Sequence, residues 1–422
     1  MGNSRSAVVL VFDRLRAGFL GPYGGTWCET PAANRLAAAG YLAEQAWADS
    51  PSLDWVYRSY WSGRHAACRS VPDACDLQTP LPAGLALAER LAAAGRYAEL
   101  LTDDPTVASH RWGEAFAERM VLHHEGPAEA AESAGAMRVA QLLAEAAERL
   151  ESLPDGSLLW VHAAAWNDAW DAPWEFRAEL ADEEDPAPPD FVDPPLRSWT
   201  GAGDPDERLG YLQAYAGQVA AWDACLDAWM AAFESSRAGE DALLLVTSPR
   251  GYPLGEHGAV GDDGAEGIAA GLHSELLQTP LFLRHPRASR PMLRDQRLWQ
   301  PPDLYSTLVD WFELPASTAA VWGESTLPRA RGEATANRAW AASVAGARFA
   351  LRTPEWLLVG EETPDAGEAH PTGLYLKPDD RWEANEVSAR CGETVESLLG
   401  CWPALRNALD DSRPDQAPAA VG

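Results

Sequence analysis

The chain has 422 residues, of which 46% are hydrophobic, so it is long enough to bury a large core in one domain or two. Its 63 acidic residues outnumber 33 basic ones, and the formal net charge of −30 argues against nucleic acid, anionic membranes and polyanionic glycans as partners. A local basic pocket could still bind a small anion.

The cysteines and the apolar runs predict a soluble, cytoplasmic protein with reduced thiols. None of the 6 cysteines forms a Cys-x-x-Cys pair, so neither a zinc ribbon nor a thioredoxin-like site is predicted. A disulfide between Cys68 and Cys75 is one possible pairing. The first apolar run is only as long as a strand, and no run reaches transmembrane length, so we expect neither a signal peptide nor a membrane span.

The first predicted element is a buried parallel strand at Ala7–Phe12, where a continuous apolar run stops at Asp13. In open α/β sheets, ligands bind beyond the carboxyl ends of such strands. Asp13 is therefore a candidate site residue. The alternative is that Asp13 only caps the turn that follows it.

Strand and helix patterns then alternate along the chain. Apolar runs predict further strands at residues 97–102, 157–162, 242–247 and 281–283. Helical spacing predicts helices at residues 31–40, 85–94, 128–150, 207–233 and 302–314. This alternation predicts an α/β domain over residues 1–315, with a mostly parallel central sheet between layers of helices.

Two segments depart from this alternation of strands and helices. Residues 182–206 are acidic and rich in proline, which predicts a surface loop near the strand ends, either a lid or an ordinary insertion. Within residues 316–422, short strands are predicted at 348–353, 355–359 and 374–376, followed by a helix at 392–409. We expect a small C-terminal subdomain made of an antiparallel sheet with one packed helix.

Short motifs follow one another along the chain in a characteristic order. After the first strand come Leu20-Gly21-Pro22-Tyr23-Gly24, Thr30-Pro31 and Ser59 to Arg64, and later Leu254-Gly255-Glu256-His257-Gly258 and Asp303-Leu304-Tyr305. In this order and spacing they resemble the sulfatase family of the alkaline-phosphatase superfamily. The resemblance covers nearly the whole chain, and it implies an alkaline-phosphatase-like fold.

The resemblance also implies a chemistry whose parts can be sought in this sequence. A sulfatase uses a formylglycine nucleophile, a divalent cation, cationic residues around the sulfate and a histidine that protonates the leaving alcohol. The nucleophile position falls on Leu53, which cannot serve. Asp54 lies beside it and is a candidate nucleophile, although the motif around it is absent.

The metal site of the family is also replaced. Of the two adjacent aspartates that follow the first strand in the family, Asp13 is present and Arg14 takes the second place. The later pair of ligands falls on Pro249 and Arg250; proline has no ligand atom, and arginine is a fixed cation. We therefore expect no cofactor, and we expect Asp13 to pair with Arg250 or Arg14. The alternative is a calcium or magnesium ion at Asp13.

The remaining catalytic positions are replaced too. The sulfate-binding lysine falls on Asp103, which Asp104 follows, and the catalytic histidine falls on Asn167, which cannot transfer protons near neutral pH. His257 is present, mostly as a scaffold position, and is kept as a catalytic candidate with Asp54 and Asn167. His162 and His273 are expected to be structural. The candidate binding residues are Arg14, Arg64, Asp103, Arg250 and Glu256.

Three functions are compatible with these residues. The first is a degenerate sulfatase that binds or regulates an unknown small molecule or protein partner. The second is an active metal-dependent sulfate- or phosphate-ester hydrolase with rewired residues, drawn from Asp13, Asp54, Asp103, Asp104, Glu256, His257 and His273. The third is a tryptophan-rich interaction module, with Trp160, Trp166, Trp170 and Trp174 near the pocket mouth, although Trp160 and Trp356 are expected in the core.

Overall fold

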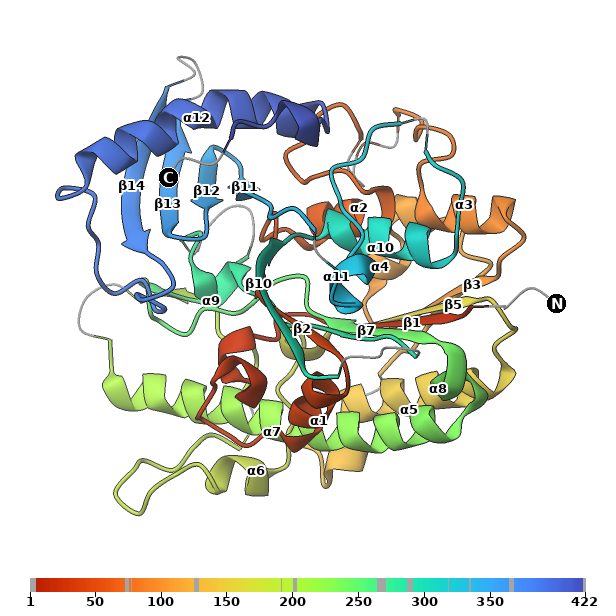
Figure 1. The fold of residues 1–422 in the computed structure, drawn as a ribbon. Coiled ribbons are helices and arrows are strands. Elements are labelled where there is room, and N and C mark those ends of the chain that lie inside the picture. The colour runs from red at the N-terminus through yellow and green to blue at the C-terminus, as the bar shows by residue number, and fades with distance from the viewer. Residues whose placement is uncertain are drawn as a thin grey trace.

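We describe the fold from a computed structural model of the chain. It describes residues 5–72, 76, 78–124, 129–190, 192–199, 203–263, 271–286, 291–317, 319–333, 335–363 and 368–419. At its centre lies an eight-stranded sheet with the strand order β10-β2-β9-β7-β1-β5-β3-β4 (Figure 1). Its strands are β1 (Ala7–Phe12), β2 (Tyr41–Ala46), β3 (Ala98–Thr102), β4 (Glu118–Val121), β5 (Leu158–Ala163), β7 (Leu243–Thr247), β9 (Leu281–Arg284) and β10 (Leu293–Trp299).

The central sheet is mostly parallel. Strand β1 pairs in parallel with β5 on one side and with β7 on the other, and β3 pairs in parallel with β5 and β4. Only β9 runs antiparallel to its neighbours, β2 and β7. The C-terminal ends of β1, β3, β5 and β7 therefore meet at one edge of the sheet, which is where α/β folds place their ligands.

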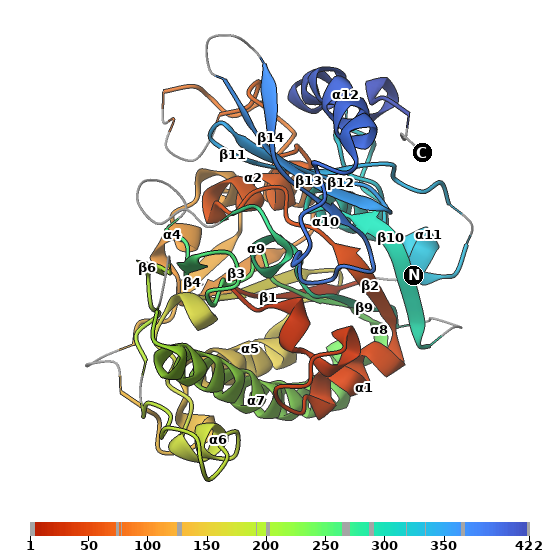
Figure 2. The ribbon, with the colours of Figure 1, turned by 90° about the vertical axis from the view of Figure 1, so that its left-hand side faces the viewer.

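Helices cover both faces of this sheet, as Figures 1 and 2 show. One layer is α1 (Pro31–Ala39), α5 (Arg138–Ser152) and α7 (Pro205–Ser235), and the other is α2 (Leu53–Ser62), α3 (Leu87–Ala93) and α10 (Pro302–Trp311). Strand β1 contributes side chains to the core under both helix layers, because successive side chains of a strand point to opposite faces. Val8 and Leu10 belong to the core cluster that contains α7, whereas Val9 belongs to the cluster that contains α2 and α10.

A second sheet is formed by the C-terminal part of the chain. Strands β11 (Ala341–Ala345), β12 (Arg348–Arg352), β13 (Trp356–Glu362) and β14 (Ala369–Leu376) are antiparallel. Helix α12 (Gly392–Asp410) covers one face, where Phe349 stacks on Trp402 at 4.2 Å between ring centroids. The opposite face packs against Trp47 and Leu276 of the central domain. The predicted fold is confirmed, while the boundary at residue 316 stays a prediction.

The shorter elements are connections between these layers. They are α4 (Pro105–Ala108), α6 (Trp174–Ala178), α8 (Arg237–Asp241), α9 (Ser274–Leu277), α11 (Leu327–Ala330) and the paired strands β6 (Arg197–Ser198) and β8 (Ala259–Val260). Between α6 and α7 the described residues are irregular apart from β6 and the Val192 bridge, and the role of this loop as a lid stays a prediction. No helix among the described residues combines the length and the apolar composition that crossing a membrane requires.

The prediction of a helix over residues 128–150 is wrong at its start. Helix α5 begins at Arg138, where the backbone amide of Arg138 donates to the Asp171 carboxylate at 2.8 Å. Residues 134–136 form a separate 3-10 turn, and residue 128 lies outside the described residues. Strands β2, β4, β10 and β11 were not predicted. In β10, Arg294, Asp295 and Arg297 interrupt the apolar pattern.

Candidate functional site

The first feature at the ligand-binding edge of the sheet is an ion pair. Asp13 directly follows β1 and is fully buried, and Arg250 follows β7, the parallel neighbour of β1. The Arg250 guanidinium donates from Nε to Asp13 Oδ1 at 3.0 Å and from Nη2 to Asp13 Oδ2 at 2.8 Å. This bidentate geometry is the strongest that arginine makes with a carboxylate. The expected pairing of Asp13 with Arg250 is present.

Both partners of the ion pair are held by the backbone around them. Arg250 Nη1 donates to the carbonyl of Pro51 at 3.0 Å, in the segment that leads into α2. The Asp13 amide donates to the carbonyl of Ala163 at the end of β5. Burial alone would lower the pKa of Arg250, but the adjacent Asp13 carboxylate, together with the charges of Asp262 and Asp104, outweighs burial and raises it. The guanidinium is therefore a permanent cation at this position.

A second arginine lies beside the pair. Arg14 donates from Nε to Asn167 Oδ1 at 2.7 Å and from Nη2 to the carbonyl of Asp262 at 2.5 Å, while its Nη1 is buried without a partner among the described residues. Asn167 Oδ1 also lies 3.4 Å from Arg250 Nη2. Burial, reinforced by the charge of Arg250, lowers the pKa of Arg14 to about 10, so Arg14 is still charged at neutral pH.

These residues do not fit a divalent cation at Asp13. Calcium and magnesium need several oxygen ligands, and both carboxylate oxygens of Asp13 are already taken by Arg250. The charges of Arg250 and Arg14 would also repel a second cation at this position. Asn167, which the sequence resemblance aligned with a catalytic histidine, accepts a hydrogen bond from Arg14 through its side-chain carbonyl oxygen, and an amide does not transfer protons near neutral pH.

The carboxylates that follow β3 hold neighbouring segments in place. Asp103 accepts a hydrogen bond from the amide of Ala164 at 2.7 Å, and its other oxygen lies 3.3 Å from His124 Nε2. Asp104 caps α4 by accepting from the amide of Thr106 at 2.7 Å. His162, on β5, binds the Tyr57 hydroxyl through Nδ1 at 2.7 Å, while its Nε2 lies 3.7 Å from Asp104, too far for a hydrogen bond.

Asp54 and Arg64 lie at opposite ends of α2. Asp54 is in the first turn, with Oδ1 at 3.1 Å from His110 Nε2. Arg64 follows Gly63, the residue that ends the helix with a φ of 70°. A helix of this length separates the backbones of the two residues by about 15 Å. The roles assigned to them from the sequence stay predictions.

The other candidates gather between the central domain and the C-terminal sheet. Glu256 pairs with the buried Arg16 at 2.6 Å, and His257 Nδ1 lies 2.6 Å from Glu275 Oε1. The imidazole rings of His257 and His273 are parallel, with centroids 3.7 Å apart. Burial disfavours the charged form of His257, but the ion pair with Glu275, together with the backbone carbonyl and the charge of Glu383, outweighs burial and raises its pKa to about 9. Burial and the charge of His257 lower the pKa of His273 to about 3.

This second group could hold a metal ion. One ligand atom from each of His257, His273 and Glu275 lies within 4.8 Å of the others. Imidazole nitrogens together with a carboxylate oxygen are typical zinc ligands. His257 Nε2 also lies 3.2 Å from the carbonyl of Glu383, an outer contact that would orient the ring. Sequence spacing could not reveal this group, because Glu275 belongs to none of the quoted motifs.

Three of the four tryptophans that the interaction-module hypothesis places at the pocket mouth lie in the interior. Trp160, Trp166 and Trp170 are all buried, and the Trp170 indole donates to the carbonyl of Trp166 at 3.1 Å. Trp174 is the exposed member of the four, with 42% of its surface accessible. The assignment of Trp160 to the core is confirmed, whereas Trp356 is only partly buried.

Five cysteines are described, and all are free thiols: Cys28, Cys68, Cys225, Cys391 and Cys401. The possible disulfide between Cys68 and Cys75 falls partly outside the described residues. The cytoplasmic location predicted from the sequence stays a prediction.

Known structures share this architecture, although comparison of the sequence with family models and with curated proteins gives no match. The structure of BT4656 in complex with its substrate D-glucosamine-2-N,6-O-disulfate superimposes with a TM-score of 0.74 at 14% identity, covering 98% of this chain and 100% of that one.

Two further structures give the same result. The phosphonate monoester hydrolase of Agrobacterium radiobacter matches with a TM-score of 0.70 at 16% identity, over 96% of each chain. BT1596, a 2-O glycosaminoglycan sulfatase, matches with a TM-score of 0.71 at 16% identity, over 98% of this chain and 93% of that one. At such identities the likeness concerns the fold alone.

Proposed function

Because the chain has the sulfatase-like fold of the alkaline-phosphatase type, we propose that it is a degenerate sulfatase, which binds a ligand or partner and does not hydrolyse esters at Asp13. The observation that carries this proposal is the bidentate ion pair between Arg250 and Asp13. A guanidinium now neutralises the carboxylate that a metal-dependent enzyme would need for its cation.

The neighbouring groups support the same conclusion. Leu53 stands where the resemblance places the nucleophile, and a hydrocarbon side chain cannot attack an ester. Asp103 and Asp104 bind backbone amides, so they act as structural acceptors. Losing a nucleophile or an oxyanion-stabilising group each costs orders of magnitude in rate, and here several are replaced together.

An ester-hydrolysis assay tests this proposal. The substrates are 4-nitrophenyl sulfate, 4-nitrophenyl phosphate and a phosphonate monoester, each with calcium, magnesium, manganese or zinc. We expect the wild-type rate to equal the buffer rate and that of Asp13→Asn, a near-isosteric variant whose folding is checked by circular dichroism. Turnover by the wild type that Asp13→Asn abolishes would overturn the proposal.

A second candidate function is a metal-dependent hydrolase centred on the histidine pair. The convergence of His257, His273 and Glu275 within 4.8 Å favours it. Elemental analysis after dialysis against zinc separates the two proposals. Stoichiometric zinc that is lost in His273→Gln, together with ester hydrolysis that is lost in the same variant but kept in Asp13→Asn, would establish this alternative.

A further inference from the structure

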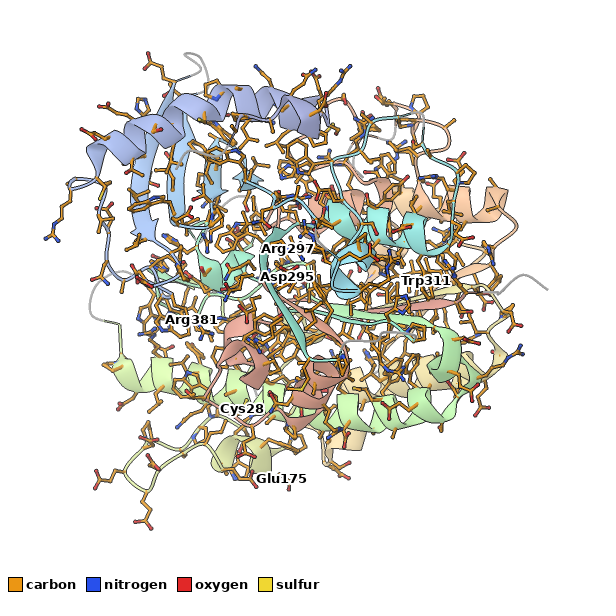
Figure 3. The ribbon with its side chains drawn as sticks, in the orientation of Figure 1. Cys28, Glu175, Asp295, Arg297, Trp311 and Arg381 are labelled. Atoms are coloured by element: carbon orange, nitrogen blue, oxygen red, sulfur yellow. The ribbon has the colours of Figure 1, made fainter. Side chains whose placement is uncertain are left out.

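A cavity of about 190 Å³ lies between the central domain and the C-terminal sheet. Its walls come from the end of β2, the end of β12, the start of β10 and the segment after β14. Neither Asp13 nor Arg250 lines it. Arg381, labelled in Figure 3, lies on the wall between the C-terminal sheet and the two short 3-10 helices that follow β1, Ala17–Phe19 and Gly21–Tyr23.

The walls of this cavity are strongly basic, in contrast to the chain as a whole. Four basic residues line it, Arg294, Arg352, Lys377 and Arg381, against one acidic residue, Glu44. The formal net charge of the chain is −30, so a local excess of positive charge needs a specific reason. The negative net charge repels polyanionic glycans and anionic membranes at long range, but a small anion can enter a basic pocket of this kind.

Two of the four cations are compensated by carboxylates. Arg294 Nε pairs with Glu44 at 2.5 Å, and Lys377 pairs with the buried Glu383. Arg352 and Arg381 have no carboxylate within ion-pair distance among the described residues. The cavity therefore carries two positive charges that no carboxylate of the described residues contacts directly, although Glu383 and Glu355 lie close enough to Arg352 to act on its charge.

Of these two arginines, Arg352 is the one whose charge costs more free energy to bury, because it is only 2% exposed. Its Nη2 donates to the side-chain oxygen of Gln45 at 3.1 Å, and its Nη1 donates to the carbonyl of Thr353. Its Nε is buried and has no partner among the described residues. A buried charge that no carboxylate contacts directly is costly. Burial lowers the pKa of Arg352 to about 10, although the charges of Glu383 and Glu355 act in the opposite direction.

Arg381 completes the positive wall. Its guanidinium lies 4.8 Å from the ring centroid of Trp382, and its Nη2 donates to the carbonyl of Tyr23 at 2.5 Å. These contacts hold the side chain at the cavity without neutralising its charge. Ser274 and Gln278 add a hydroxyl and an amide to the same lining.

We propose that this cavity is a binding site for a small oxyanion, either free phosphate or sulfate or the same group on a small molecule, held by Arg352 and Arg381. Guanidinium groups suit such oxyanions because their planar N–H donors pair with two oxygens at once. The volume equals that of roughly six water molecules, which is below the range of drug-sized sites and matches a small ligand.

Calorimetric titration of the full chain with inorganic phosphate, sulfate or acetate, at constant ionic strength, tests this site. We expect phosphate or sulfate to bind at one site per chain. Arg352→Gln and Arg381→Gln should each weaken binding about tenfold or more, because each removes a charge-assisted donor. The control Arg331→Gln removes an exposed arginine that pairs with Glu333 and should leave affinity unchanged.

Two outcomes of the titration would contradict the proposal. If acetate alone binds, the site is a carboxylate site and the proposal is wrong in ligand class. If the wild type binds none of the anions, or if both cavity variants bind as tightly as Arg331→Gln, the site does not exist as proposed. Because Arg352 is buried, the partly exposed Arg381 provides a variant that folds independently of the cost at Arg352. The readout is binding, so it stands or falls separately from hydrolysis at Asp13.

Discussion

Asp13 and Arg250 lie at the C-terminal ends of two neighbouring parallel strands, joined by hydrogen bonds of 3.0 and 2.8 Å. The carboxylate is fully buried, and only 8% of the Arg250 side chain is accessible. Neither charge can lose its partner without leaving the other in an environment of low polarity. The pair therefore stabilises the folded state, and it is also the reason that a cation cannot bind Asp13.

A double-mutant cycle measures how much the Asp13–Arg250 pair contributes to the free energy of unfolding. Arg250→Met and Asp13→Leu should each lower the free energy of unfolding by about 3–5 kcal/mol, since each strands one buried charge. The double variant should lose less than the sum of the two, because it leaves neither member of the pair without the other. Urea denaturation gives all four values.

The matched control is an exposed ion pair in the same chain. Arg237 and Asp155 are 81% and 49% accessible, so Arg237→Ala should cost no more than about 1 kcal/mol. If Arg250→Met cost as little as this control, the Asp13–Arg250 pair would not be the buried contact described above.

Asp49 predicts a pH dependence of a specific sign. Burial raises its pKa to about 7, although the Ser59 hydroxyl and the Ala66 amide donate to it at 2.6 and 2.9 Å. A raised pKa means that the folded state binds the proton more tightly than the unfolded state. This stability is complete below the unfolded pKa of about 3.9 and is lost as the pH rises through about 7.

Asp49→Asn stays uncharged and should escape that loss. Between pH 4 and pH 8, the free energy of unfolding of the variant relative to the wild type should therefore rise by about 4 kcal/mol. Urea denaturation at a series of pH values checks this, with the exposed Asp155→Asn as control. A difference between variant and wild type that is constant across this range would contradict the assignment.

Trp170 and Trp174 should respond differently to truncation. Trp170 is fully buried against Tyr215 and Tyr252, so Trp170→Ala should lower the free energy of unfolding by about 3–5 kcal/mol. Trp174 is 42% exposed, and Trp174→Ala should change it by no more than about 0.5 kcal/mol. Equal losses in the two variants, measured by chemical denaturation, would refute this distinction.

The strands and the sheet edge could be predicted because their cause is local. The apolar run that ends at Asp13 identifies a buried parallel strand without reference to other residues. The pairing of Arg250 with Asp13 was also predictable, because both follow recognisable strands that end at one edge of the sheet. The start of α5 was not, because the cap comes from Asp171, more than thirty residues along the chain.

The basic cavity could not be predicted from the sequence, for a similar reason. Arg294, Arg352 and Arg381 come from separate segments and share no motif. A single arginine in a sequence carries no sign of whether a carboxylate will face it. That Arg352 has no described carboxylate partner depends on how the C-terminal sheet packs on β2, which is a property of the tertiary structure.

Calorimetric titration of calcium into the metal-free protein, with Asp13→Asn as the reference, tests whether Arg250 excludes a cation from Asp13. We predict that the wild type takes up no calcium beyond what Asp13→Asn takes up, because the Arg250 guanidinium occupies both oxygens of Asp13. Binding of one calcium ion per chain that disappears in Asp13→Asn would contradict it.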